Sequence, residues 1–154
     1  MSSLSASGKQ SVVLVVGYDG TEPAERALKV AAAMIDESTG RMEVVFVAHM
    51  PSSVAFSPMG TASVEEGLAD EATQLAGRVD DVLRPTGIKW HFQRRNGEIA
   101  PQLLAAAAEQ FDSEGPDTHL VLVLGGTAHK IDRYLNSTPA KVLRQDRFEV
   151  FVVP

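Results

Sequence analysis

Four short apolar runs, none broken by a polar residue, constrain the fold of this chain more than any other feature. They are Val12–Val16, Val44–Ala48, Leu120–Leu124 and Val150–Val153. Apolar runs that do not alternate with polar residues are typical of strands buried on both faces, as in parallel sheets. A fifth segment, Ile88–Arg94, does alternate, and its period of two predicts a strand with one wetter face at the edge of a sheet.

Helical patterns separate the runs. Apolar residues at helical spacing predict a helix from Glu22 to Ile35, with Thr21 as its N-cap. The same spacing predicts helices over Val64–Leu83, Ile99–Phe111 and, at the end, Pro139–Gln145, and it leaves Met50–Ser63 and Asp112–Thr118 as the two long polar loops. The order of elements predicts a Rossmann-like α/β fold, with a five-stranded parallel sheet, helices on both faces and right-handed crossovers.

Length and charge limit the classes of protein to consider. A chain of 154 residues is expected to form one domain, here residues 11–154, after a flexible polar tail over residues 1–10. A formal net charge of −6 argues against nucleic-acid binding. No apolar run approaches the roughly 20 residues that span a bilayer, and the polar start does not resemble a signal peptide. The absence of cysteine fits the cytoplasm, which is the expected location.

Two turns at strand ends are the candidate ligand sites, because ligands of open α/β sheets bind at the carboxyl ends of the strands. Asp19 follows the first strand, and its carboxylate suits a ribose hydroxyl or a purine amino group. Asp19-Gly20 also suits a local turn that satisfies nearby N–H groups and needs no ligand. Gly125-Gly126 lets a backbone approach a phosphate, with Ser137 and Thr138 at the next helix start, or merely relieves a tight turn.

The chain resembles the universal stress protein family from Ser11 to Pro154. The segments that carry the resemblance are "VVLVVGYDGTEPAERAL", "VVFVAHM", "NGEIAPQLLAAA" and "AKVLRQDRFEVFVVP". The resemblance implies an adenine nucleotide alpha hydrolase-like fold and a homodimer joined through the final strand, Glu149–Pro154. An apolar edge strand is expected to be paired or covered, although burial under the chain's own helices would also satisfy it.

Nucleotide-binding members of that family carry G-x-x-G, nine residues, then G-[S/T], and this chain departs from the motif. Gly125 matches, but Ala128 replaces the second glycine and Asn136 replaces the third, before Ser137. The interval from Gly125 to Asn136 is also two residues short. The phosphate half of the site is therefore expected to be weakened and the nucleoside half retained.

The resemblance implies a nucleotide site built by eleven residues: Gly17, Tyr18, Asp19 and Met50 around the nucleoside, and Gly125, Gly126, Thr127, His129, Asn136, Ser137 and Thr138 around the phosphates. The implied ligand is ATP, AMP or a cyclic nucleotide, with Mg²⁺ as a companion ion. AMP or a cyclic nucleotide would demand less of the shortened loop.

No catalytic motif accompanies this site. The sequence holds no Walker loop and no G-x-S-x-G elbow, and its four histidines do not have the spacing of a metal site. His49 is expected to be a hydrogen-bonded packing residue. The chain is predicted not to be an enzyme, with weak ATP hydrolysis as the most it would show.

Two hypotheses about function remain open. One is a regulatory protein that responds to a nucleotide, with Met50–Ser63 as a lid. The other is a homodimeric stress-response module that binds no nucleotide. Both involve an unknown protein partner, and neither involves nucleic acid or a membrane.

Overall fold

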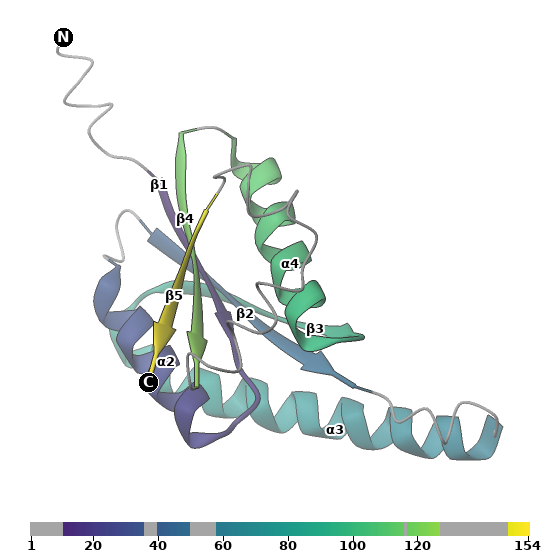
Figure 1. Cartoon of the computed structure of the whole chain (residues 1–154). Coiled ribbons are helices and arrows are strands. Elements are labelled where there is room, and N and C mark those ends of the chain that lie inside the picture. The colour runs from purple at the N-terminus through teal and green to yellow at the C-terminus, as the bar shows by residue number, and fades with distance from the viewer. Residues whose placement is uncertain (1–10, 36–39, 50–57, 116, 127–147) are drawn as a thin grey trace, which may run out of the picture.

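A single five-stranded parallel sheet organises the protein, with strand order β3-β2-β1-β4-β5. The computed structural model describes residues 11–35, 40–49, 58–115, 117–126 and 148–154 (Figure 1). The strands are β1 (Ser11–Gly17), β2 (Gly40–Ala48), β3 (Lys89–Asn96), β4 (Thr118–Gly125) and β5 (Glu149–Val153). The helices are α2 (Glu22–Met34), α3 (Pro58–Leu83), the short 3₁₀ helix η2 (Arg84–Thr86) and α4 (Ile99–Glu114). The predicted fold class is confirmed.

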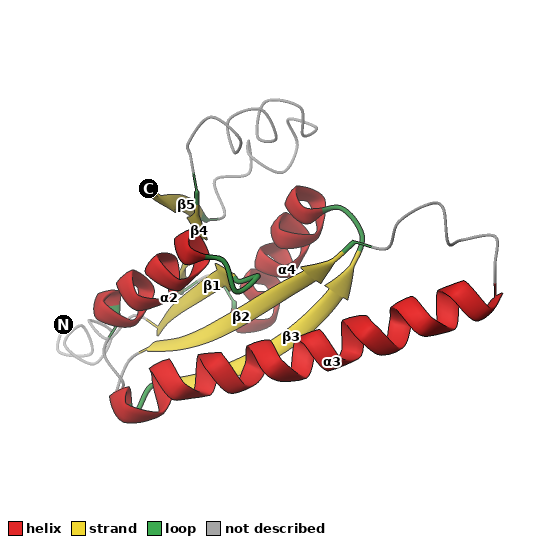
Figure 2. Ribbon diagram, turned by 90° about the horizontal axis from the view of Figure 1, so that it is seen from below, coloured by secondary structure: helices red, strands yellow, loops and turns green. Residues whose placement is uncertain are grey.

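The helices cover the two faces of the sheet in separate layers. Helices α2 and α3 lie on one face and α4 lies on the other (Figures 1 and 2). Along β1, Leu14 and Val16 belong to the core under α2 and α3, whereas Val13 and Val15 belong to the core under α4. All four are at most 1% exposed, which explains why this run does not alternate with polar residues.

The two edge strands differ in character. β3, predicted to be an edge strand, is confirmed as one, and its Trp90 and Phe92 pack against the α2/α3 core. Lys89 and His91 of the same strand are exposed. β5 forms the other edge and leaves Phe151 44% exposed. One edge therefore carries charged and polar side chains, and the other carries an exposed aromatic ring.

A buried carboxylate explains why β2 is longer than predicted. Glu43 is 3% exposed and accepts hydrogen bonds at Oε2 from Gln93 Nε2, at 2.6 Å, while His91 Nδ1 lies 2.7 Å from the same oxygen. Arg41 lies 3.6 Å from the other oxygen. Polar residues paired in this way extend β2 to Gly40, four residues before the predicted start, because burying a charge is tolerated when partners surround it.

The helices α3 and α4 are longer than predicted. α3 begins at Pro58, not at Val64, so the last six residues of the predicted loop Met50–Ser63 are helical. Its N-terminal turns extend beyond the ends of β2 and β3 (Figure 2), so these turns do not lie over the sheet. α4 continues to Glu114, so the predicted loop Asp112–Thr118 is wrong at both of its ends, since β4 begins at Thr118.

The start of α2 follows the prediction. Thr21 is the N-cap, and its side-chain oxygen accepts a hydrogen bond from Ala24 N at 3.4 Å. The predicted tail over residues 1–10 and the predicted helix Pro139–Gln145 lie outside the described residues. Within the described ranges, no helix has the length and apolar character needed to cross a bilayer.

Candidate functional site

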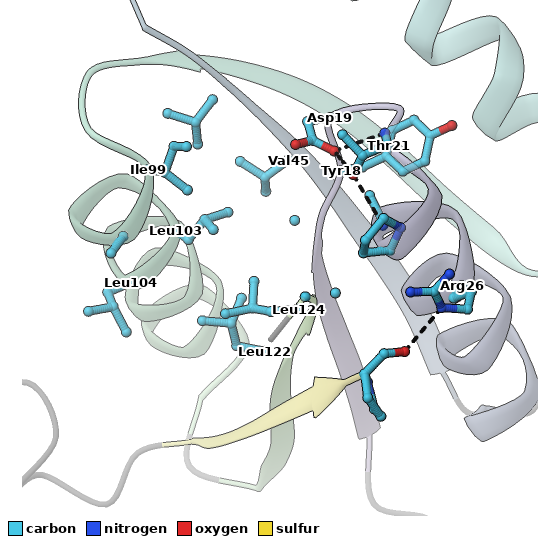
Figure 3. A pocket seen from close by; sticks show the side chains of 18 residues that line it. Tyr18, Asp19, Thr21, Arg26, Val45, Ile99, Leu103, Leu104, Leu122 and Leu124 are labelled. Atoms are coloured by element: carbon cyan, nitrogen blue, oxygen red, sulfur yellow. Dashed lines mark hydrogen bonds between the residues drawn. The ribbon is translucent and has the colours of Figure 1, made fainter. Parts of the chain in front are cut away.

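A cavity of about 660 Å³ opens at the carboxyl ends of β1 and β4 (Figure 3). The Asp19 turn and the Gly125-Gly126 turn both border it, so the two candidate turns meet at one mouth. A volume of this size falls within the roughly 300–1,000 Å³ that small-molecule sites occupy. Its described lining is Gly17, Tyr18, Asp19, Thr21, Pro23, Ala24, Arg26, Val45, Val47, Ile99, Ala100, Leu103, Leu104, Leu122, Leu124, Gly125, Gly126 and Pro154.

Asp19 forms a local turn at the entrance to α2. Its Oδ1 accepts hydrogen bonds from Thr21 N at 3.0 Å and from Thr21 Oγ1 at 2.6 Å. These contacts are those of the ligand-free turn that the sequence also allowed. They occupy one carboxylate oxygen, and the side chain is exposed at the rim of the cavity. Asp19 thus holds its turn while its second oxygen accepts no hydrogen bond from any described residue.

Gly125 is required by packing against the start of α2. A β-carbon at this position would lie 2.1 Å from the carbonyl oxygen of Pro23 and 2.9 Å from Ala24 N. The backbone of the Pro23–Ala24 peptide leaves no room for a side chain. This close approach accounts for the glycine without any phosphate.

Gly126 has a different reason to be glycine. Its φ is +134°, a conformation that residues with a β-carbon rarely adopt, and a β-carbon there would meet nothing within 4 Å. Its N–H donates to the carbonyl oxygen of Val153 at 3.0 Å. Because that hydrogen bond joins the end of β4 to β5, the amide is not free to bind an anion.

Gly17 brings the sheet close to α4. A β-carbon on Gly17 would lie 3.0 Å from Leu124 Cδ2 and 3.1 Å from Leu103 Cδ1. Because glycine has no side chain, the space between these two leucines stays open at the base of the cavity. A larger residue here would occupy space that a ligand needs.

Tyr18 contributes to the cavity through its position and not through its hydroxyl. Its side chain is 2% exposed in the α2/α3 core and donates a hydrogen bond to Glu25. Figure 3 shows the ring directed away from the leucines of α4. Burial, together with the hydrogen bond to Glu25, raises the pKa of the Tyr18 hydroxyl far above its usual range, so the hydroxyl stays a donor. Tyr18 lines the cavity, and its role around the adenine stays a prediction.

An apolar wall is the part of the site that sequence reasoning missed. Ile99 and Leu103 of α4, Leu122 and Leu124 of β4, and Val45 of β2 line it. Ile99 is 51% exposed, unusual for a large apolar side chain. All five residues belong to the apolar patterns that predict buried strands and the core-facing side of a helix. Only their position near strand ends and at a helix start distinguishes them.

The eleven predicted site residues fall into two groups. Gly17, Tyr18, Asp19, Gly125 and Gly126 are brought together, whereas Met50, Thr127, His129, Asn136, Ser137 and Thr138 lie outside the described residues. His49 was expected to be a packing residue, but it is exposed at the end of β2. Among the described residues, no group of three potential ligands could hold a metal ion.

Comparisons with known proteins identify the family that the sequence resembles. A model of the universal stress protein family matches residues 13–154. A comparison with curated protein sequences gives no significant match.

Solved structures share the fold at low sequence identity. A protein of that family from Burkholderia pseudomallei is 21% identical, with a TM-score of 0.66, over 95% of this chain and 97% of that one. A universal stress protein in complex with cAMP is 21% identical, with a TM-score of 0.57, over 94% and 98%. A family protein from Arabidopsis thaliana with AMP bound is 13% identical, with a TM-score of 0.54, over 92% and 90%.

Proposed function

The chain belongs to the universal stress protein family, and from that premise we propose that it is a regulatory protein that binds an adenine nucleotide. The observation that carries the proposal is the cavity that Asp19 and the Gly125-Gly126 turn border together. The AMP-bound and cAMP-bound relatives support the choice of ligand class.

The described part of the cavity suits a nucleoside better than a chain of phosphates. Its apolar wall offers contact area to a flat base, and Asp19 offers a carboxylate oxygen to a ribose hydroxyl or an amino group. The two described glycines offer less to phosphate. Gly125 packs against the Pro23 backbone, and the Gly126 N–H donates a hydrogen bond to the carbonyl oxygen of Val153. We therefore place AMP or a cyclic nucleotide ahead of ATP.

Magnesium has no described ligand set of its own in this proposal. Among the described residues that line the cavity, only Asp19 has an acidic side chain, and one acidic side chain does not make a dedicated site. Mg²⁺ would enter as the companion of a polyphosphate. The proposed role is regulatory and cytoplasmic, and no reaction is assigned to the site.

Calorimetric titration with AMP, cAMP and ATP tests the proposal. We expect heat of binding from at least one of the three, with AMP or cAMP tighter than ATP. No heat from any of them at about millimolar concentration would refute it, because a dissociation constant near 1 mM corresponds to only about 4 kcal/mol of binding free energy.

A second candidate function rests on a separate observation. Phe151 is 44% exposed on the edge strand β5, and an edge strand of this kind favours pairing with another chain. We propose a homodimer through Glu149–Pro154 that serves as an interaction module and needs no nucleotide. Mass spectrometry of small molecules released from the purified, denatured protein separates the two functions: a stoichiometric adenine nucleotide selects the first, and none selects the second.

A further inference from the structure

We infer that Arg78 of α3 is a positioning residue of the proposed nucleotide site, acting through the Asp19 turn. The inference rests on the proposed function and adds a residue that lies outside the cavity. Arg78 lies 58 positions along the chain from Gly20. Its guanidinium nevertheless contacts the turn directly.

Two charge-assisted hydrogen bonds join Arg78 to both sides of the turn. Its Nη2 donates to the carbonyl oxygen of Gly20 at 3.1 Å and to Glu25 Oε1 at 2.9 Å. Gly20 follows Asp19, and Glu25 lies in the first turn of α2. A planar guanidinium holds two acceptors in a fixed relation better than a flexible ammonium does.

The Glu25 carboxylate links the same contact to the end of β1. Its Oε1 also accepts the hydrogen bond from the Tyr18 hydroxyl. Glu25 N donates to the carbonyl oxygen of Thr21 at 2.9 Å, which is the first backbone bond of the helix. Residues immediately before and after Asp19 are thus fixed by one cluster on the α3 side of the sheet.

The packing of Gly20 makes the arrangement tight. Its φ is +81°, and a β-carbon there would lie 2.6 Å from Leu75 Cδ2 and 2.9 Å from Arg78 Nη1. The turn therefore rests on α3 with no spare volume. Asp19 Oδ1 accepts hydrogen bonds from Thr21. Contacts that fix Gly20 and the start of α2 therefore also fix the direction of the Asp19 carboxylate.

The test uses the full chain with Arg78→Gln, Arg78→Lys and the control Arg84→Gln. Arg84 is a suitable control because it lies just beyond α3 and pairs with Asp80, away from the turn. For Arg78→Gln we expect the Thr21 amide to exchange its hydrogen about tenfold faster by NMR, and the Kd for AMP to rise about tenfold. Arg78→Lys should lie between Arg78→Gln and the wild type, and Arg84→Gln should match the wild type.

The readouts separate this inference from the proposed function. An unchanged Thr21 exchange rate in Arg78→Gln overturns the inference, and so does an unchanged Kd in a chain that binds AMP. If the wild-type chain binds none of AMP, cAMP and ATP, the proposed function fails. The Thr21 exchange rate then still decides whether Arg78 holds the turn.

Discussion

Gly125 lies directly against the backbone of Pro23, so close that a β-carbon on Gly125 would reach within 2.1 Å of the Pro23 carbonyl oxygen. The contact joins the carboxyl end of β4 to the first turn of α2, which are the two elements on either side of the cavity mouth. The close packing of this glycine therefore fixes the width of the mouth.

Gly125→Ala is expected to destabilise the protein. The added methyl group has rigid backbone atoms on its far side, and overpacking of this kind costs about 2 kcal/mol or more. A thermal melt should show a Tm lower by roughly 4 °C or more. Gly126→Ala is the control, since its added carbon meets nothing within 4 Å and carries only backbone strain of about 1 kcal/mol. Equal losses in both variants would contradict the packing explanation.

Asp19→Ala is expected to raise the Kd for AMP about tenfold or more, because it removes a charged hydrogen-bond acceptor from the rim. Asp19→Asn should retain more affinity, since the amide oxygen can still accept from Thr21 and hold the turn. Calorimetry measures both changes. Glu66→Gln removes the same charge from an exposed side chain of α3 outside the described lining of the cavity, and it should leave the Kd unchanged. Wild-type affinity in Asp19→Ala would remove Asp19 from the site.

Phe151→Lys is expected to convert the proposed homodimer to a monomer. The substitution places a charge on the β5 edge, and charged side chains are a common means of blocking edge pairing. Sedimentation at about micromolar concentration measures the change. Met34→Lys makes the same replacement at a side chain on α2 that is 42% exposed, and it should stay dimeric. A wild-type monomer at that concentration would rule out the pairing.

The ion pair between Glu65 and Arg94 should make stability depend on pH in the acid range. A hydrogen bond from Arg94 lowers the pKa of Glu65 from its ordinary 4.5. A lowered folded-state pKa gives a contribution that is present above the ordinary value and disappears as pH falls through the lowered one. The Tm difference between the wild type and Glu65→Gln should therefore be full at neutral pH and shrink as the pH falls below the ordinary value of 4.5.

Glu66→Gln is the matched control for that titration. Glu66 is the next residue of α3 and is exposed, and no described residue forms an ion pair with it. Its Tm difference from the wild type should be small throughout. A Tm difference for Glu65→Gln that stays constant down to acid pH would show that the pair contributes nothing to folding.

Gly77→Ala is expected to stabilise the protein. Gly77 lies inside α3, is exposed, and leaves a β-carbon free of contacts within 4 Å. Replacing an interior helical glycine by alanine gains about 0.5–1 kcal/mol, mainly by restricting the unfolded chain. Chemical denaturation should show a higher midpoint with an unchanged slope. A lower midpoint would mean that α3 needs a glycine at this position.

Most of the fold follows from local sequence patterns. Strands such as Val12–Val16 and Leu120–Leu124 are apolar on both faces because both faces are covered, and the pattern reports this directly. The pattern fails where polar residues have partners far along the chain. Glu43 appears too polar for a buried strand until His91 and Gln93, nearly fifty residues away, are brought beside it.

The candidate site was harder to predict from the sequence than the fold, because one residue type can serve several physical purposes. A Gly-Gly pair at a strand end looks the same whether it faces a phosphate, packs on a backbone as Gly125 does, or adopts a positive φ as Gly126 does. Asp19 kept both of its alternatives open for a similar reason. Arg78 gave no signal at all, since its acceptors at Gly20 and Glu25 lie more than fifty residues away.

The unlike edges of the sheet limit how far such chains can associate. If two copies join at β5, the outermost strand at each end of the combined sheet is β3, which presents Lys89 and His91 to water. A third copy would have to add a strand beside the charged Lys89 and the polar His91, and the desolvation of these side chains opposes it. Growth therefore stops at two subunits, so the exposed ring of Phe151 does not start an open-ended fibre.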